Sequence, residues 1–127
     1  MRDPADGAIK LLVIQRALEL RRAHPDLFFQ GSYLPLRATG PRHNNVITFA
    51  RVRGRAAAIA VAGRFFLNLP PDPWASSTLA IRRELPLGAY RDVFTDRTFQ
   101  IDTGVRKRGL PLREVFGTLP IALLHSI

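Results

Sequence analysis

The residues best suited to chemistry are ten aspartates and glutamates, and their positions along the chain argue against catalysis. Glycoside hydrolysis needs two carboxyl groups held ~5 to 10 Å apart across the scissile bond. Most of the acids fall at predicted helix ends, in turns or on exposed helix positions, where capping and solvation are their ordinary roles. They are Asp3, Asp6, Asp26, Asp72, Asp92, Asp96, Asp102, Glu19, Glu84 and Glu114. The sequence therefore predicts no catalytic carboxylate pair.

Other nucleophiles and metal ligands are few. The chain has no cysteine and three widely separated histidines, which excludes thiolate metal sites and disfavours an all-histidine site. Ser32, Ser76, Ser77 and Ser126 lack the Gly-x-Ser-x-Gly context of a nucleophile elbow. The glycines are isolated, so no phosphate-cradling loop is indicated. We expect no catalytic residue, no metal site and no cofactor in this chain.

Three aromatic residues are the best candidates for binding. Tyr33, Trp74 and Tyr90 could stack on sugar rings, because each offers a flat apolar face. Each also has a structural alternative. Trp74 follows the proline-rich segment 69–73, and a lone tryptophan after a loop usually folds back onto the core. Both interpretations, a carbohydrate contact and a core position, stay open from sequence.

The net charge of +9 at pH 7 favours an anionic partner on electrostatic grounds. Seventeen of the nineteen cationic residues are arginine, they are spread along the chain, and no nucleic-acid-binding module accompanies them. A compositional bias of the genome can produce such an arginine content as readily as the need to bind an anionic ligand. We expect no nucleic-acid partner, and tight DNA binding with a steep salt dependence would contradict this expectation.

A length of 127 residues and an apolar content of 46% are enough for one domain with one core. No apolar run approaches the ~20 residues that cross a bilayer. The first four residues include an aspartate and a proline where a secretory signal would carry its hydrophobic segment. We expect a cytoplasmic protein without a membrane partner.

The N-terminal third predicts one long helix from about Ala8 to His24, with Asp6 as its N-cap and Pro25 ending it. At helical spacing its apolar residues form two stripes on nearly opposite sides. One stripe contains Ile9, Leu12, Val13, Ala17 and Leu20, and the other contains Leu11, Ile14 and Leu18. Two interpretations stay open: the helix is sunk in its own core, or it is sandwiched between this domain and something outside the chain.

The rest of the chain consists of short segments at strand spacing, separated by glycine and proline. The clearest pair is 46–52 and 56–62, which a tight turn at 53–55 joins as a hairpin. Further strands are expected at 33–38, 65–69, 78–81, 90–94, 99–101 and 121–125, with one or two helical turns at 112–119.

The predicted fold class is α+β or mostly β. It consists of one long N-terminal helix, then an antiparallel sheet or sandwich of about seven strands, with a short helix near the C-terminus. We expect residues 1–31 to form the helix and its connection and residues 32–127 to form the β domain, in a single compact unit.

Several motifs together resemble the alpha-amylase family. Asp-Gly-Ala-Ile-Lys-Leu at 6–11, Leu-Arg-Arg-Ala-His-Pro at 20–25 and Gly-Ser-Tyr-Leu-Pro-Leu at 31–36 are similar to the last barrel helix of that family and its junction with domain C. Further similar segments are 46–51, 74–79, 90–95 and 110–124. Within the family, the chain most resembles the maltooligosyl trehalose synthases.

This resemblance implies that the chain is the C-terminal end of a larger enzyme. Such enzymes convert the reducing-end α-1,4 linkage of a maltooligosaccharide into an α,α-1,1 linkage in trehalose biosynthesis, without a cofactor. The catalytic carboxylates of the family lie upstream, so no residue of this chain inherits a catalytic role.

The resemblance also implies a partner, the catalytic barrel, which this accessory domain would pack against and stabilise. The second helix stripe, Leu11, Ile14 and Leu18, would then supply the interdomain packing. The alternative is a stand-alone carbohydrate-binding β module.

Overall fold

The structure is a computed structural model that describes residues 4–41, 45–63, 74–116 and 120–127, apart from the side chains of 4–10 and 12–14. Four helices lie within these ranges: α1 (Pro4–Ala23), α2 (Pro25–Gln30), α3 (Thr103–Arg108) and α4 (Leu112–Val115). The described strands are β1 (Ser32–Pro35), β2 (Ala38–Thr39), β3 (Val46–Arg53), β4 (Ala56–Gly63), β5 (Thr78–Leu79), β6 (Gly88–Asp92), β7 (Thr98–Ile101), β8 (Leu110–Pro111) and β9 (Ile121–Ser126).

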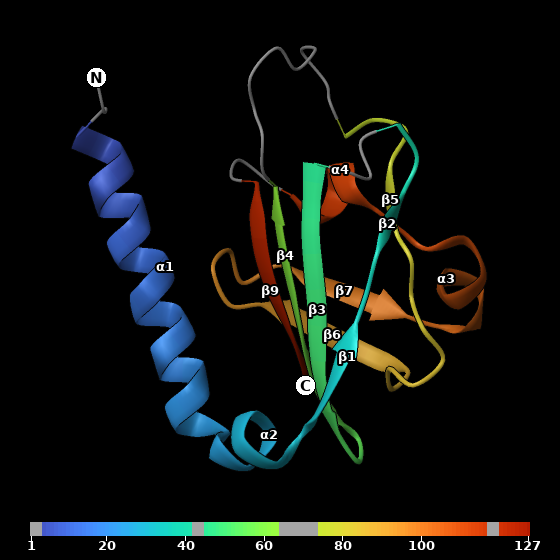
Figure 1. Ribbon diagram of the computed structural model, residues 1–127, viewed down its shortest axis with the longest axis horizontal. Helices are drawn as coiled ribbons and strands as arrows, with labels where there is room; N and C mark the ends of the chain where they lie inside the picture. The colour runs from blue at the N-terminus through green and yellow to red at the C-terminus, as the bar shows by residue number, and fades with distance from the viewer. Residues whose placement is uncertain (1–3, 42–44, 64–73, 117–119) are drawn as a thin grey trace.

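Six of these strands form one antiparallel sheet in the order β1-β3-β4-β9-β6-β7, and β2, β5 and β8 form a second, smaller sheet (Figure 1). The β3–β4 hairpin is confirmed, with Arg53 paired to Ala56 across a two-residue turn. Gly54 opens this turn with a φ of 59°. A glycine at the first central position with positive φ is typical of the type II′ turns that close hairpins.

The main core lies on one face of the six-stranded sheet. Side chains from both sheets and from α3 and α4 form one buried cluster there, which includes Ile59, Leu79, Tyr90, Ile101, Leu112 and Leu124. Val61 and Ala122, paired between β4 and β9, also belong to it. Because this cluster covers one face of the six-stranded sheet, the N-terminal helices pack against the opposite face.

The opposite face has a smaller cluster of buried residues. Leu20 at the end of α1 and Leu27 of α2 pack there against Ala58 of β4, with Phe28 and Val93 at the margin. Figure 1 shows the C-terminal end of α1 close to the sheet, whereas the N-terminal end of α1 lies farther from the sheet. Among the side chains of α1 that the structure describes, those of its last turns anchor it to the β domain.

The predicted fold class is wrong in its architecture. The described residues are mostly β, with nine strands divided between a six-stranded and a three-stranded sheet, where one sheet or sandwich of about seven strands was expected. The helical residues are divided among four helices instead of one long N-terminal helix and one short C-terminal helix. The three strands of the second sheet have two residues each, too few to leave a periodic pattern.

A proline and a capping aspartate explain two helix boundaries that differ from the predicted ones. Pro25 ends α1 and also begins α2, because its fixed φ and missing N–H suit the first helical position. Asp102 caps the unexpected helix α3, since its Oδ1 accepts a hydrogen bond from the Val105 N–H at 2.8 Å. Asp6 lies inside α1, so the expected N-cap there is wrong.

The strand expected at 65–69 and the proline-rich segment 69–73 lie outside the described residues.

In the described part of the chain, no helix is both long enough and apolar enough to cross a membrane.

Candidate functional site

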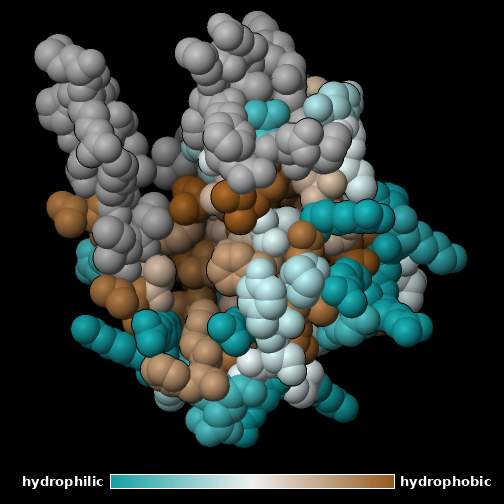
Figure 2. Space-filling model, viewed as in Figure 1, coloured by the Kyte–Doolittle hydropathy of each residue, from teal (hydrophilic) through white to brown (hydrophobic). Residues whose placement is uncertain are grey.

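The face of the six-stranded sheet beside α1 has an apolar hollow, which we call the apolar groove. Its volume is about 190 Å³, and apolar side chains of β3, β4 and β9 line it together with Ala17 of α1 and Phe94. The outward residues of those strands are Ile47, Phe49, Ala60, Ala62, Ile121 and Leu123. Figure 2 shows hydrophobic side chains gathered in the hollow beside α1. The sheet thus has apolar residues on both faces, as expected for a sheet that is covered on both sides.

Large apolar side chains are exposed both on this face of the sheet and on α1. Ile47 is 49% exposed and Phe49 is 38% exposed on the sheet, while Leu11 is 70% exposed and Leu18 is 44% exposed on α1. Leu11 and Leu18 belong to the second helix stripe, and the side chain of Ile14 lies outside the description. A run of exposed apolar side chains next to an apolar hollow is typical of an interaction surface.

An exposed aromatic pair lies at the β1–β3 edge of this same face. The rings of Tyr33 and Phe49 are stacked with centroids 5.7 Å apart and an interplanar angle of 29°. The Arg51 guanidinium lies 5.6 Å from the centre of the Tyr33 ring, and its Nη1 donates to the Gly31 carbonyl at 3.3 Å. Tyr33 is therefore a surface aromatic held in place by its neighbours.

The other two aromatic candidates lie in the main core. The Tyr90 side chain is fully buried, and its hydroxyl donates to the Pro86 carbonyl at 2.7 Å. Burial raises the pKa of Tyr90 to about 12, against a smaller opposing effect of the charge on Arg106. Trp74 is half-buried and meets the Phe116 ring edge-on at 5.0 Å. The structure does not bring Tyr33, Trp74 and Tyr90 onto one surface.

Two aspartates that could have supplied carboxyl chemistry have structural hydrogen bonds. Asp92 is fully buried and accepts from the Phe94 N–H at 3.1 Å, the Thr95 hydroxyl at 2.9 Å and the Leu123 N–H at 3.3 Å. Asp102 is the cap of α3. Within the described residues, no group of three or more histidine, aspartate or glutamate side chains could hold a metal ion.

A second hollow lies where the end of α1 meets β6 and β9, and sequence reasoning missed it. His24 and His125 face each other there with ring centroids 4.1 Å apart. Burial, together with the nearby charges of His24 and Arg91, lowers the pKa of His125 to about 4. Nothing in the sequence relates the two histidines. They meet because β9 pairs His125 with Ala58 of β4, and the end of α1 packs against Ala58 through Leu20.

Comparison with known proteins identifies relatives that share most of this chain. Two Mycobacterium tuberculosis proteins, from strains CDC 1551 and H37Rv, are each 35% identical to it over 115 residues. Both have the provisional name maltooligosyl trehalose synthase. The match covers 91% of this chain and 13% of each relative, so the chain spans about one eighth of the relatives' length. No family model matches the chain.

A solved structure agrees with these relatives. A mutant of maltooligosyltrehalose synthase from Arthrobacter ramosus superimposes with a TM-score of 0.73 at 33% sequence identity. The match covers all of this chain and 15% of the other chain. Sequence and structure therefore both relate this chain to a small part of the same kind of enzyme.

Proposed function

Because this chain is a homologue of one segment of maltooligosyl trehalose synthase, we propose that it is a domain of such an enzyme. The whole enzyme would be a cytoplasmic isomerase of trehalose biosynthesis. It would convert the reducing-end α-1,4 linkage of a maltooligosaccharide into an α,α-1,1 linkage. The 127 residues would be an accessory domain that packs against the catalytic barrel and stabilises it, and they would have no turnover by themselves.

The apolar groove carries this proposal. Its lining is apolar throughout, and Ile47 and Phe49, which belong to that lining, are also partly exposed to solvent. Such a surface is stabilised when another apolar surface covers it, by roughly 25 cal/mol per Å² removed from water. The relatives contain a further stretch of chain, several times longer than this one, that could supply the cover.

The structural roles of Asp92 and Asp102 support an accessory function. Asp92 and Asp102 are engaged with backbone N–H groups, which a catalytic carboxylate would have to give up. A retaining glycosidase mechanism needs a nucleophile and an acid/base held ~5 Å apart. In the proposed enzyme both would come from the rest of the protein.

Complementation between two polypeptides tests the proposal. The Arthrobacter enzyme without its homologous segment would be mixed with the 127-residue chain. We expect the chain to bind and to raise the thermal midpoint of the truncated enzyme. We also expect it to increase formation of a non-reducing product from maltopentaose. The variant Ile47→Asp/Phe49→Asp should bind at least ~10-fold more weakly, because each substitution places a charge in the apolar interface.

The matched control is Arg55→Gln, since Arg55 is exposed in the β3–β4 turn, away from the apolar groove. This variant should complement as well as the unchanged chain. Equal complementation by the double aspartate variant would contradict a role for the apolar groove. Turnover of maltopentaose by the isolated chain would contradict the accessory role.

The second candidate function is carbohydrate binding by the chain alone, which the exposed Tyr33–Phe49 pair favours. Titration of the isolated chain with maltopentaose separates the two candidates. Saturable binding that Tyr33→Ala abolishes and Arg55→Gln retains would support a carbohydrate-binding module. Absence of binding by the unchanged chain would remove this candidate.

A further inference from the structure

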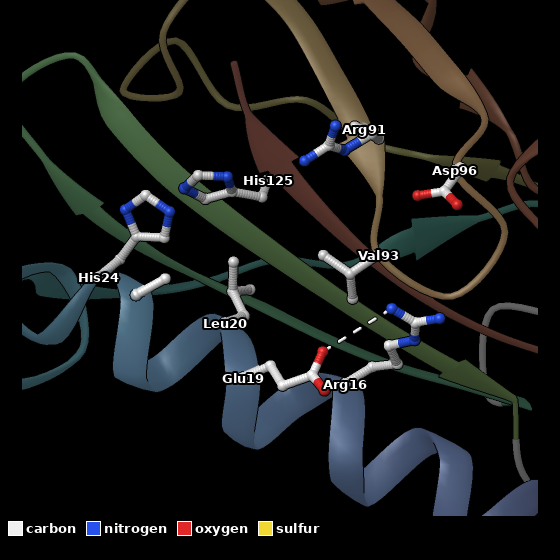
Figure 3. Close-up of a pocket in the computed structure, with 9 residues that line it drawn as sticks. Arg16, Glu19, Leu20, His24, Arg91, Val93, Asp96 and His125 are labelled. Carbon is white, nitrogen blue, oxygen red and sulfur yellow. Dashed lines mark ion pairs between the residues drawn. The ribbon is translucent and has the colours of Figure 1, made fainter.

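The second hollow is built from residues distant in sequence (Figure 3). Its volume is about 220 Å³, and it lies between the C-terminal end of α1 and the strands β6 and β9. Arg91 of β6 is paired with His125 of β9 in the antiparallel register, so both side chains leave the sheet on the same face. His24 reaches the same place from the junction of α1 and α2 and stacks on His125 at 4.1 Å, with an interplanar angle of 40°.

The nitrogen atoms of this cluster lack acceptors within the described part of the chain. His125 is 8% exposed, and neither its ring nor the Arg91 guanidinium makes a hydrogen bond or an ion pair with a described residue. The side chains of His24 and Arg91 are exposed and reach the hollow from its solvent side, while His125 forms its nearly buried wall. All three groups can therefore donate to acceptors of a ligand that enters the hollow.

We propose that this hollow binds a small tetrahedral oxyanion of the phosphate class, held by the imidazoles of His24 and His125 and by the guanidinium of Arg91. An arginine fork matches two oxygens of such an anion, and imidazole N–H groups donate to the others. The net charge of +9 raises the local concentration of anions around the whole chain.

Two acids also line the hollow, and the geometry keeps them from opposing the anion. Glu19 is paired with Arg16, whose Nη1 lies 3.7 Å from its Oε2. Figure 3 shows the Arg91 guanidinium directed toward His125, with the Asp96 carboxylate on the other side of Arg91. The space between the histidines and Arg91 is therefore the positive part of the hollow.

Anion binding at this place is coupled to proton uptake. Burial, His24 and Arg91 hold the pKa of His125 down at about 4, so its imidazole is neutral at pH 7 when the hollow is empty. A bound anion stabilises the imidazolium form and raises that pKa. Linkage then requires the affinity to increase as the pH falls, because the complex holds more protons than the free protein.

The test is an NMR titration of the histidine ring protons of the 127-residue chain with inorganic phosphate at pH 7. Chloride keeps the ionic strength constant, so that screening does not change during the titration. We expect saturable shifts of the His24 and His125 resonances. The variant Arg91→Gln should weaken binding about 10-fold, since it removes one charge-assisted hydrogen-bonding group. Arg55→Gln, a variant with the same charge change outside the hollow, should bind as the unchanged chain does.

Two further titrations test the coupling to protonation and identify the chemical form of the bound anion. Sulfate keeps its charge between pH 8 and pH 6, so tighter sulfate binding at pH 6 reports protonation of the protein. Glucose 6-phosphate distinguishes the source of the oxyanion: tighter binding than inorganic phosphate assigns a phosphate monoester, and weaker binding assigns the free ion. The proposal is overturned if the shifts do not saturate, if Arg91→Gln and Arg55→Gln bind equally, or if sulfate binding does not change with pH. None of these results bears on the interdomain role.

Discussion

Replacing Asp92 by alanine is the most informative single perturbation of this fold. Asp92 is the last residue of β6, and its carboxylate joins the turn before β7 to the neighbouring strand β9. The Asp92→Ala variant removes the acceptor for the N–H groups of Phe94 and Leu123 and for the Thr95 hydroxyl. No other side chain is shortened or displaced by the substitution itself.

The expected cost follows from what happens to each donor. Thr95 is exposed, so its hydroxyl can turn to water. The two N–H groups lie at a fully buried carboxylate, and an unsatisfied buried donor costs about 1–3 kcal/mol. We therefore expect Asp92→Ala to lower the free energy of unfolding by about 3 kcal/mol. For a domain of this size that corresponds to a melting temperature lower by about 10–15 °C.

Urea unfolding followed by circular dichroism measures this difference directly. Asp92→Asn is the matched variant, because its amide oxygen still accepts from the N–H groups while the charge is lost. We expect it to cost about 1 kcal/mol. A loss below about 1 kcal/mol for Asp92→Ala, or equal losses for the two variants, would refute the reasoning. It would mean that water replaces the carboxylate at no cost.

Four other expectations can be checked by the same unfolding assay. His125 has a folded-state pKa of about 4 against an ordinary value of 6.5, so the unfolded chain takes up the proton first and stability is lost as the pH falls from about 6.5 to 4. Between pH 7.5 and pH 4.5 this contribution is about 2 kcal/mol, and His125→Gln should lose that much less over the same range. Leu20→Ala should cost about 2 kcal/mol, because Leu20 is buried against the sheet. Leu18→Gln on the exposed side of α1 should change stability by less than about 0.5 kcal/mol, and a larger loss would place Leu18 in the core of the isolated chain. Asp102→Ala should cost about 1 kcal/mol through loss of the α3 cap, and helical content measured by circular dichroism should fall with it.

Local signals in the sequence are enough for the elements whose hydrogen bonds close within a few residues. The β3–β4 hairpin is an example, because alternation on both sides of a two-residue glycine turn leaves one register that pairs Arg53 with Ala56. The end of α1 before Pro25 is another, since proline disfavours helical geometry in the preceding residue. The second stripe of α1 also has a counterpart in the structure, where Leu11 and Leu18 are exposed. Their role in interdomain packing stays a prediction.

Sequence patterns could not divide the aromatic residues into core and surface. Tyr33, Trp74 and Tyr90 look alike in sequence, yet Tyr90 is fully buried and Tyr33 is 57% exposed. The difference depends on which face of a strand is covered and by what. A strand pattern alone does not contain that information, because one strand's alternation marks two faces without saying which packs inward.

By itself, the sequence determined the hairpin, the helix end at Pro25 and the two-sided apolar character of α1, because these depend on contacts between near neighbours. Tertiary structure decided the strand order, the apolar groove and the His24–His125–Arg91 cluster. The physical reason is the placement of β9 between β4 and β6, which pairs the end of the chain with its middle. That placement puts Leu123 beside Ala60 and Arg91 beside His125. Such pairings are set by burial of the whole sheet, which no local pattern encodes.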